Sequence, residues 1–279
     1  MIRYFFRGTI HFLTAFHVGA PGGIKQRVDN PVLTDVYGNP VIPGSSLKGL
    51  IRSCAERSAE ILGLKACGLF YKTEDETDCV TTGTNKEKED LREKLREKES
   101  GKKINENDTT EDVLSFLKGK LCHTCWLFGS SYHASRVRFP DPSLISESWT
   151  NTLDRRDGVG IDRDSGLAVN GVKYDFETVP AGVRYTFKAE GEDLDEKDLA
   201  LLGAALLEMT NGSLSLGGKK SRGLGRFRLE DLEAAMVDLN IKEDFLHFLA
   251  GDKEKFHWIK ASEFFEPYIK TRLEVRTGI

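Results

Sequence analysis

One short segment in the first fifth of the chain combines an acid, a helix start and two cations. Asp29 stands in a Val-Asp-Asn-Pro-Val sequence, and a Pro-Gly-Ser-Ser-Leu-Lys-Gly block follows it. Ser45 or Ser46 can cap a helix here, and the free N–H groups of its first turn favour a phosphate. Lys48 and Arg52 lie four residues apart on one helical face, so both can reach the same strand of phosphates. The segment predicts an anion-binding helix N-terminus beside an exposed acidic loop.

A second cationic segment is rich in glycine. Gly-Gly-Lys-Lys-Ser-Arg-Gly-Leu-Gly ends at residue 225, and its cations are Lys219, Lys220 and Arg222. Glycines let the backbone approach a ligand closely, while the side chains supply positive charge. The spacing is not that of a P-loop, and the segment precedes a strand instead of a helix, which argues against a dinucleotide site. A phosphate-contacting loop and an ordinary solvated cationic loop both remain open.

Four cysteines form a third group of candidates. Cys122 and Cys125 are separated by two residues, which lets two thiolates take adjacent corners of a tetrahedron. Together with Cys67 and Cys79 they predict an all-thiolate zinc site, in which His123 is an alternative to one cysteine. Ordinary buried thiols are the competing interpretation. The strand–CxxC–helix pattern of a thioredoxin-like redox site is not present.

Composition limits the classes of protein that this chain can be. It has 279 residues and a net charge of −4, so it is not a basic nucleic-acid coat. The charge is segregated, however: residues 216–229 carry five cations and no acid, whereas acids collect in residues 190–198 and 230–266. A basic face on an acidic protein is therefore compatible with the composition.

The chain lacks the usual signs of export or membrane insertion. Residues 1–7 alternate like a strand and show no signal-peptide core, and the longest apolar run, residues 199–207, is too short to span a bilayer. Five cysteines without an export signal favour reduced thiols. We expect a cytoplasmic protein with no membrane partner.

Hydrophobic periodicity predicts alternating strands and helices within a single domain, residues 1–279. The expected strands are 2–13, 174–179, 183–189 and 226–230, with helices at 45–62 and 199–209. Residues 64–125 are expected to be a charged insertion that holds the zinc site, and residues 231–279 a helical appendage. This order predicts an α+β fold with a ferredoxin-like (RRM-like) core and insertions.

These motifs resemble those of the RAMP backbone subunits of type III CRISPR effector complexes. The Val-Asp-x-Pro-Val and Pro-Gly-Ser-Ser-Leu-Lys-Gly blocks carry the resemblance, as does the segment from Val159 to Ala168. The glycine-rich loop is shared across many RAMP proteins. The similar stretches are residues 2–57, 121–190 and 198–230, although the charged insertion and the acidic tail are longer than the minimal family pattern.

The resemblance implies a function. Such subunits polymerise along a guide CRISPR RNA together with related RAMP subunits and with large and small subunits, and many of them cut the paired target RNA. Asp29 matches the acid that cutting requires, and the expected cofactor is Mg²⁺ or another divalent cation. Some of these subunits carry a zinc knuckle in the same inserted region.

The resemblance also assigns residues 151–190 to a thumb β-hairpin that crosses the guide–target duplex and displaces a base pair. Arg155, Arg156 and Arg163 would contact phosphate. The apolar side chains of Val159, Ile161 and Leu167 would wedge under a base, unless they are simply core residues.

Three functions remain open at this stage. The first is an endoribonuclease that uses Asp29, with Asp35 as the next candidate acid. The second is an RNA-binding scaffold without activity, in which Asp29 is only a turn residue. The third is a guide-processing endonuclease that uses His17 as a general acid or base.

Overall fold

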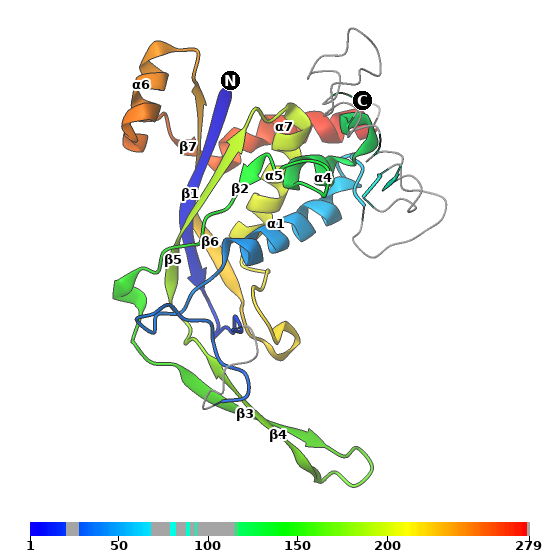
Figure 1. The fold of residues 1–279 in the computed structure, drawn as a ribbon, viewed down its shortest axis with the longest axis vertical. Helices are drawn as coiled ribbons and strands as arrows, with labels where there is room; N and C mark the ends of the chain where they lie inside the picture. Colours follow the sequence, from blue (N-terminus) through cyan, green and yellow to red (C-terminus); the bar gives the residue numbers. More distant parts are fainter. Residues whose placement is uncertain are drawn as a thin grey trace.

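The computed structural model describes residues 1–20, 28–67, 79–81, 88–89, 93, 115 and 117–277. These residues form an α+β fold, as predicted, with a five-stranded antiparallel sheet and a separate two-stranded hairpin (Figure 1). The strand order in the larger sheet is β2-β5-β1-β6-β7. Its strands are β1 (Ile2–Phe12), β2 (Val137–Arg138), β5 (Arg184–Glu192), β6 (Phe227–Asp238) and β7 (Ile259–Lys260).

The main core lies between the sheet and the helices on one of its faces. The predicted alternation of β1 is confirmed, because Tyr4, Phe6, Ile10 and Phe12 all belong to this core. Helices α1 (Gly44–Ala59), α4 (His123–Phe128), α5 (Glu196–Glu208) and α7 (Ala261–Thr277) cover this side of the sheet (Figure 1). Leu47, Ile51 and Ala55, which carry the apolar pattern of the predicted first helix, belong to it, and α1 places its Cys54 there too.

The start of α1 differs from the predicted cap. Its N-cap residue is Pro43, which makes no side-chain cap, so neither Ser45 nor Ser46 caps the helix. Instead the Gly44 N–H donates to Oδ1 of Asp141, 2.6 Å away. A carboxylate from a distant segment thus already serves one of the free donors that the sequence assigns to phosphate.

Helices α5 and α7 pack closely through a glycine. A Cβ at Gly203 would lie 2.5 Å from the ring of Phe265, which is fully buried. Helix α5 begins at a capping box in which Asp195 accepts from the N–H of Asp198. The C-terminal helix is therefore part of the core, although the sequence predicts residues 231–279 as an appendage.

This packing gives a prediction on stability. Replacing Gly203 with alanine should lower the free energy of unfolding by about 1–3 kcal/mol, because overpacking forces neighbouring atoms to move. Replacing Gly49 is the matched control: its Cβ would meet nothing within 4 Å, and alanine in an exposed helix should stabilise by up to about 1 kcal/mol. Denaturant unfolding of the two variants should give changes of opposite sign, and equal changes would contradict the packing argument.

Strand β6 extends further than predicted. It continues through the acidic residues 230–238, which belong to the sheet and not to a helical tail. The strand absorbs an irregularity near Asp231, whose φ is +51°. Beyond it, Ala235 and Val237 pack with Phe5 against Phe248 of α6 (Lys242–Ala250) on the opposite face of the sheet.

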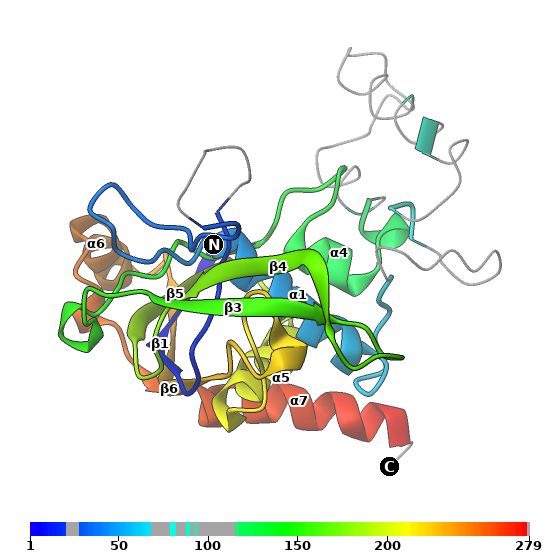
Figure 2. The ribbon, with the colours of Figure 1, turned by 90° about the horizontal axis from the view of Figure 1, so that it is seen from below.

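The second sheet is a long hairpin that projects from the lower end of the molecule and crosses it in the view from below (Figures 1 and 2). It consists of β3 (Asp154–Ile161) and β4 (Ala168–Thr178). The sequence predicts that strands 174–179 and 183–189 are joined by a turn at residues 180–182. The two strands do follow each other in the chain, but they do not pair with each other. Strand β4 pairs with β3, whereas β5 pairs with β1 and β2.

Most of the predicted charged insertion lies outside the described residues. Its described ends, near residues 64–67 and 117–125, carry the cysteines discussed below. Within the described part of the chain, every helix is too short or too polar to cross a lipid bilayer.

Candidate functional site: a carboxylate at the base of the hairpin

Asp29 is exposed and lies beside the base of the hairpin. Its neighbour Asn30 forms a parallel β-bridge with Phe176 of β4. The Asn30 N–H donates to the carbonyl of Asp175 (3.2 Å), and the Glu177 N–H donates to the carbonyl of Asn30 (3.0 Å). The acidic segment is therefore a short extra strand along β4, not an isolated turn.

The carboxylate of Asp29 is held by a reciprocal pair of hydrogen bonds with Asp175. Oδ2 of Asp29 accepts from the Asp175 N–H at 3.0 Å, and Oδ1 of Asp175 accepts from the Asp29 N–H at 2.7 Å. Arg155 donates to Oδ2 of Asp175. The Asp29 N–H and then Arg155 hold the pKa of Asp175 below its usual range. Among the described residues, Oδ1 of Asp29 has no hydrogen-bond partner, so it is available to a cation.

The glycine-rich loop packs on the same strand. The ammonium of Lys219 lies 4.4 Å from the ring centre of Phe176 and 5.2 Å from that of Tyr174. Arg222 donates to the Tyr174 hydroxyl. Two of the three cations predicted to contact RNA therefore fasten the loop to the hairpin, while Lys220 is exposed. A contact between a cation and the face of an aromatic ring stabilises a protein by roughly 0.5–2 kcal/mol, depending on how well the cation is solvated.

His17 lies underneath this loop and has a structural place. It is buried, and its Nδ1 donates to the carbonyl of Glu177 at 2.8 Å. Its own carbonyl accepts from the Gly218 N–H at 2.7 Å. A Cβ at Gly217 would lie 2.3 Å from that carbonyl oxygen. The close approach of loop and strand explains the glycines, and it leaves His17 poorly placed as a general acid or base.

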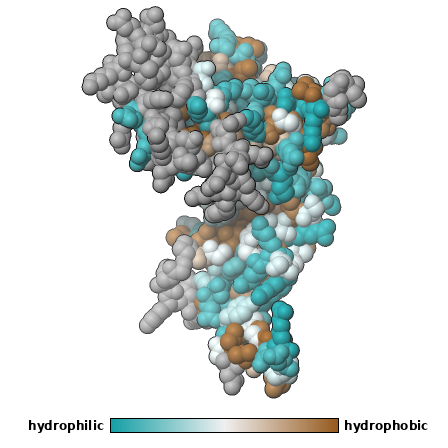
Figure 3. Space-filling view, turned by 90° about the vertical axis from the view of Figure 1, so that its right-hand side faces the viewer, coloured by the Kyte–Doolittle hydropathy of each residue, from teal (hydrophilic) through white to brown (hydrophobic). Residues whose placement is uncertain are grey.

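The free end of the hairpin is apolar and exposed. The exposed fractions are 51% for Val159, 62% for Ile161 and 69% for Leu167, so their interpretation as core residues is wrong. Hydrophobic atoms gather at the lower end of the molecule in the space-filling view (Figure 3). Arg156 and Arg163, on the same hairpin, are exposed and make no ion pair with any described residue. Solvent-facing apolar side chains on a projecting hairpin suit insertion between bases.

A groove of about 460 Å³ runs along the first half of α1. Ser45, Lys48 and Arg52 line it, together with residues 128–130 and 133–135. Partial burial, and then the charge of Arg52, lower the pKa of Lys48. No hydrogen bond or ion pair joins these residues to the glycine-rich loop within the described ranges.

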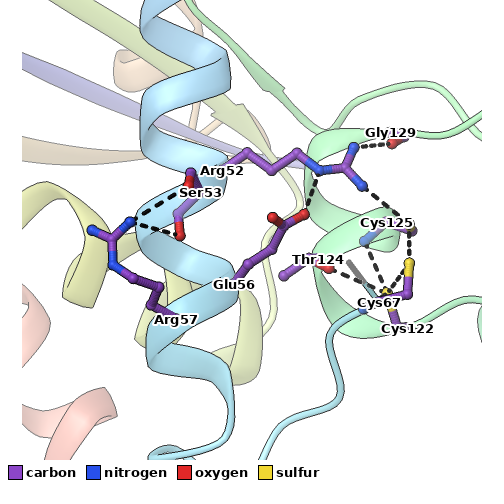
Figure 4. Close-up of polar contacts among 9 residues, drawn as sticks. All are labelled: Arg52, Ser53, Glu56, Arg57, Cys67, Cys122, Thr124, Cys125 and Gly129. Carbon is purple, nitrogen blue, oxygen red and sulfur yellow. Dashed lines mark hydrogen bonds and ion pairs between the residues drawn. The ribbon is translucent and has the colours of Figure 1, made fainter. Parts of the chain in front are cut away.

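Arg52 has a second task that the sequence did not predict. Its Nε donates to Glu56 (2.9 Å), and its Nη1 donates to the carbonyl of Gly129 (3.1 Å). Its Nη2 donates to Sγ of Cys125 (3.3 Å). Figure 4 shows the guanidinium reaching from α1 across to the cysteines. Arg52 therefore ties the helix to the cysteine cluster, with much of its donor capacity already used.

The four cysteines predicted from spacing lie together. The sulfur atoms of Cys67, Cys79, Cys122 and Cys125 are all within 4.8 Å of one another, and all four residues are buried. Two of these separations are 3.3 and 3.4 Å. Zinc–sulfur bonds of about 2.3 Å place tetrahedral sulfurs about 3.8 Å apart, so the cluster has the size of a metal site.

The surroundings of the sulfurs also fit a cation. Hydrogen bonds with the other thiols, with Cys122 most strongly, lower the pKa of Cys79, whereas contacts within the same cluster, again first with Cys122, raise the pKa of Cys67. Four buried thiolates repel one another unless a metal neutralises them. His123 does not replace a cysteine, because its Nδ1 accepts from the Lys65 N–H at 2.9 Å.

Comparison with known families identifies the superfamily to which this chain belongs. A model described as the RAMP superfamily matches residues 9–228, from β1 to the start of β6. The chain belongs to the RAMP superfamily. The match spans Asp29, the groove along α1, the cysteine cluster, the hairpin and the glycine-rich loop. The family predicted from the motifs is therefore confirmed.

Three relatives share the printed name "CRISPR system Cms endoribonuclease Csm3". The one from Streptococcus thermophilus is 27% identical over 83% of this chain and 89% of its own length. The one from Methanocaldococcus jannaschii is 25% identical, with coverages of 81% and 78%. The one from Enterococcus italicus is 23% identical, with coverages of 84% and 93%. This RAMP chain is thus similar to endoribonucleases along most of its length.

Sequence reasoning missed two acids that shape the site. Asp175 stands between Tyr174 and Phe176, and its only sequence signal is a charge within an otherwise aromatic strand. Asp141 lies in a loop and has no signal at all. Both act on segments more than ninety residues away in the chain, so only the tertiary fold reveals them.

Proposed function

We propose that this RAMP chain is a backbone subunit of a type III CRISPR complex, which binds guide RNA and cuts paired target RNA at Asp29. The observation that carries the proposal is an exposed carboxylate, fixed at the base of a projecting hairpin, with one oxygen that has no hydrogen-bond partner among the described residues. Relatives of similar length are named endoribonucleases. Its partners would be guide RNA, target RNA, further copies or related RAMP subunits, and large and small subunits.

We also infer that the core is ferredoxin-like. Four of the strands have the order β2-β5-β1-β6, with α1 following β1 and α5 following β5. That order is the one expected when two β-α-β units share one antiparallel sheet. The hairpin, the cysteine-bearing segment and the C-terminal helices are then additions to this core.

The hairpin and the cations prepare the RNA for cutting. Exposed apolar side chains at the hairpin end, such as Ile161 and Leu167, displace a base at a cost of a few kcal/mol, which backbone contacts offset. Arg156, Arg163 and Lys220 are exposed and reach phosphates. Lys48 and Ser45 face the groove along α1, where a second stretch of phosphates fits. These contacts carry no sequence information, so any guide is accepted.

The distorted nucleotide then aligns for cleavage beside Asp29. A ribose 2′-oxygen forms a bond to phosphorus as the bond to the 5′-oxygen breaks; the 2′ proton goes to solvent and the leaving oxygen takes one up. Asp29 fits a hard cation, because it is exposed and its Oδ1 has no partner in the part of the chain that the structure describes. A divalent cation such as Mg²⁺, when bound, supplies charge neutralisation at the phosphate. The protein's own contribution is to hold the reacting groups in line.

We further propose that the cysteine cluster binds structural Zn²⁺. A soft, fully thiolate donor set favours zinc over harder ions. Thr124 lies 3.2 Å from Sγ of Cys122, and Arg52 donates to Cys125, so the sulfurs have neighbours that orient them. The metal would join the two described ends of the inserted segment to α4 and, through Arg52, to α1.

The function is tested with the assembled complex and labelled RNA. We expect regularly spaced cuts in a complementary target, none in an unrelated RNA, loss of cutting with a chelator and recovery with Mg²⁺. Metal-independent cutting of precursor guide RNA would instead identify a processing endonuclease. Guide binding without any target cutting would identify a scaffold.

A further inference from the structure

We propose that Asp175 is a positioning residue that couples the carboxylate of Asp29 to the hairpin. This inference rests on the proposed function and deepens it, because it names the group that places the catalytic acid. It concerns a residue that contacts neither RNA nor cation and acts through Asp29 alone.

The contacts of Asp175 point away from any direct role. Only 8% of its surface is exposed. One of its carboxylate oxygens accepts from the Asp29 N–H and the other accepts from Arg155. A carboxylate whose oxygens are both occupied, one of them by a guanidinium, is a poor ligand for a divalent cation.

The same contacts fix Asp29 at two points. Its backbone N–H donates to the Asp175 side chain, while its own Oδ2 accepts from the Asp175 backbone. The side chain of Asp29 therefore cannot rotate freely, because its Oδ2 and its backbone N–H are both bonded to Asp175. Arg155 on β3 holds Asp175 in turn, so both strands of the hairpin contribute to the position.

A mechanical consequence follows from this arrangement. The hairpin end that displaces the base and the residue that places Asp29 belong to one hairpin, because Ile161 ends β3 and Asp175 lies on β4, with which β3 pairs. A hairpin that seats correctly on the duplex brings Asp29 to the phosphate beside the displaced base, and a badly seated one withdraws it. Misplacement by about 1 Å can cost about 100-fold in rate, so such coupling would make cutting depend on correct pairing.

The test compares three variants of the assembled complex under single-turnover conditions. Asp175→Ala removes the side-chain acceptor and should slow target cutting by about 10- to 100-fold, with guide and target affinities unchanged within about 2-fold. Asp175→Asn keeps an oxygen that can accept from the Asp29 N–H, and it should restore the rate to within about 5-fold of the unaltered chain. Asp157→Ala is the matched control, since Asp157 lies opposite Asp175 in the register of the hairpin but pairs with Lys173 at 3.4 Å and makes no hydrogen bond or ion pair with Asp29.

The results separate this inference from the function on which it rests. Loss of cutting in Asp29→Ala with full cutting in Asp175→Ala would overturn the positioning role alone. Full cutting in Asp29→Ala would overturn both. A fall in RNA affinity that matches the fall in rate, or a defect in Asp157→Ala as large as that in Asp175→Ala, would show a general effect on the hairpin and would also overturn the positioning role. If Asp175→Ala does not assemble, a rate for Asp175→Asn far below the expected range overturns it.

Discussion

Replacing Asp29 with alanine is expected to lower the rate of target-RNA cutting by at least about 100-fold, the usual scale for removing a catalytic acid or cation ligand. The physical reason is that Asp29 is exposed and its Oδ1 is unpaired among the described residues, at the base of the projecting hairpin. Guide binding should be unchanged, because Asp29 adds no positive charge to the phosphate contacts. Labelled target RNA and a filter-binding assay with guide RNA measure the two quantities.

Asp35 supplies the matched control. It is also an exposed acid in the loop before α1, but its carboxylate accepts from the N–H groups of Tyr37 (2.8 Å) and Asn39 (2.9 Å). These bonds, that from Asn39 first, lower the pKa of Asp35 and identify it as a turn residue. Asp35→Ala should cut at the normal rate. Equal cutting by Asp29→Ala and the unaltered chain would mean that Asp29 is only a turn residue, as Asp35 is. The catalytic role of Asp29 would then be wrong.

The second large effect concerns the metal. The purified chain should contain about one zinc ion per molecule. Cys122→Ala should lose this zinc and several kcal/mol of the free energy of unfolding, because zinc binding contributes about 10 kcal/mol or more to the folding of small zinc sites. Metal analysis and thermal unfolding measure both. Loss of the zinc should also change the position of Arg52 in the groove along α1, because Arg52 donates to Cys125.

Cys54→Ala is the control for this experiment. Cys54 is also fully buried, but it lies in α1 outside the cluster, with Arg57 as its polar neighbour. Burial raises the pKa of its thiol to about 11, as expected for a core residue that binds no metal. Cys54→Ala should keep its zinc. A zinc content far below one per chain in the unaltered protein would mean that the cluster consists of ordinary buried thiols.

The two cationic segments differ in what holds them. Lys219 and Arg222 rest on the rings of β4, whereas Lys48 lines the groove along α1 and Arg52 is bound to α4. Each segment is thus attached to a separate structural element. Under the proposed function, contact with RNA would be spread over both elements, which fits a subunit that follows a long phosphate backbone.

Local features of the sequence determined a large part of this protein. Alternation predicted β1, three- and four-residue spacing predicted α1, a short apolar run predicted α5, and cysteine spacing predicted the four sulfurs of the cluster. These signals work because burial of one face, and the reach of a metal ligand, act over a few residues. The motifs around Asp29 and the glycine-rich loop were enough to indicate the family.

Tertiary structure alone decided how these pieces act together. Asp141 at the start of α1, Asp175 beside Asp29, and Arg52 on the cysteine cluster each join segments that are far apart in the chain. Partner choice in such contacts depends on which strands and helices become neighbours, and no local periodicity encodes that. The same reason applies to the hairpin tip: apolar residues in a sequence indicate a core, and only a strand that leaves the sheet turns them towards solvent, where a base can meet them.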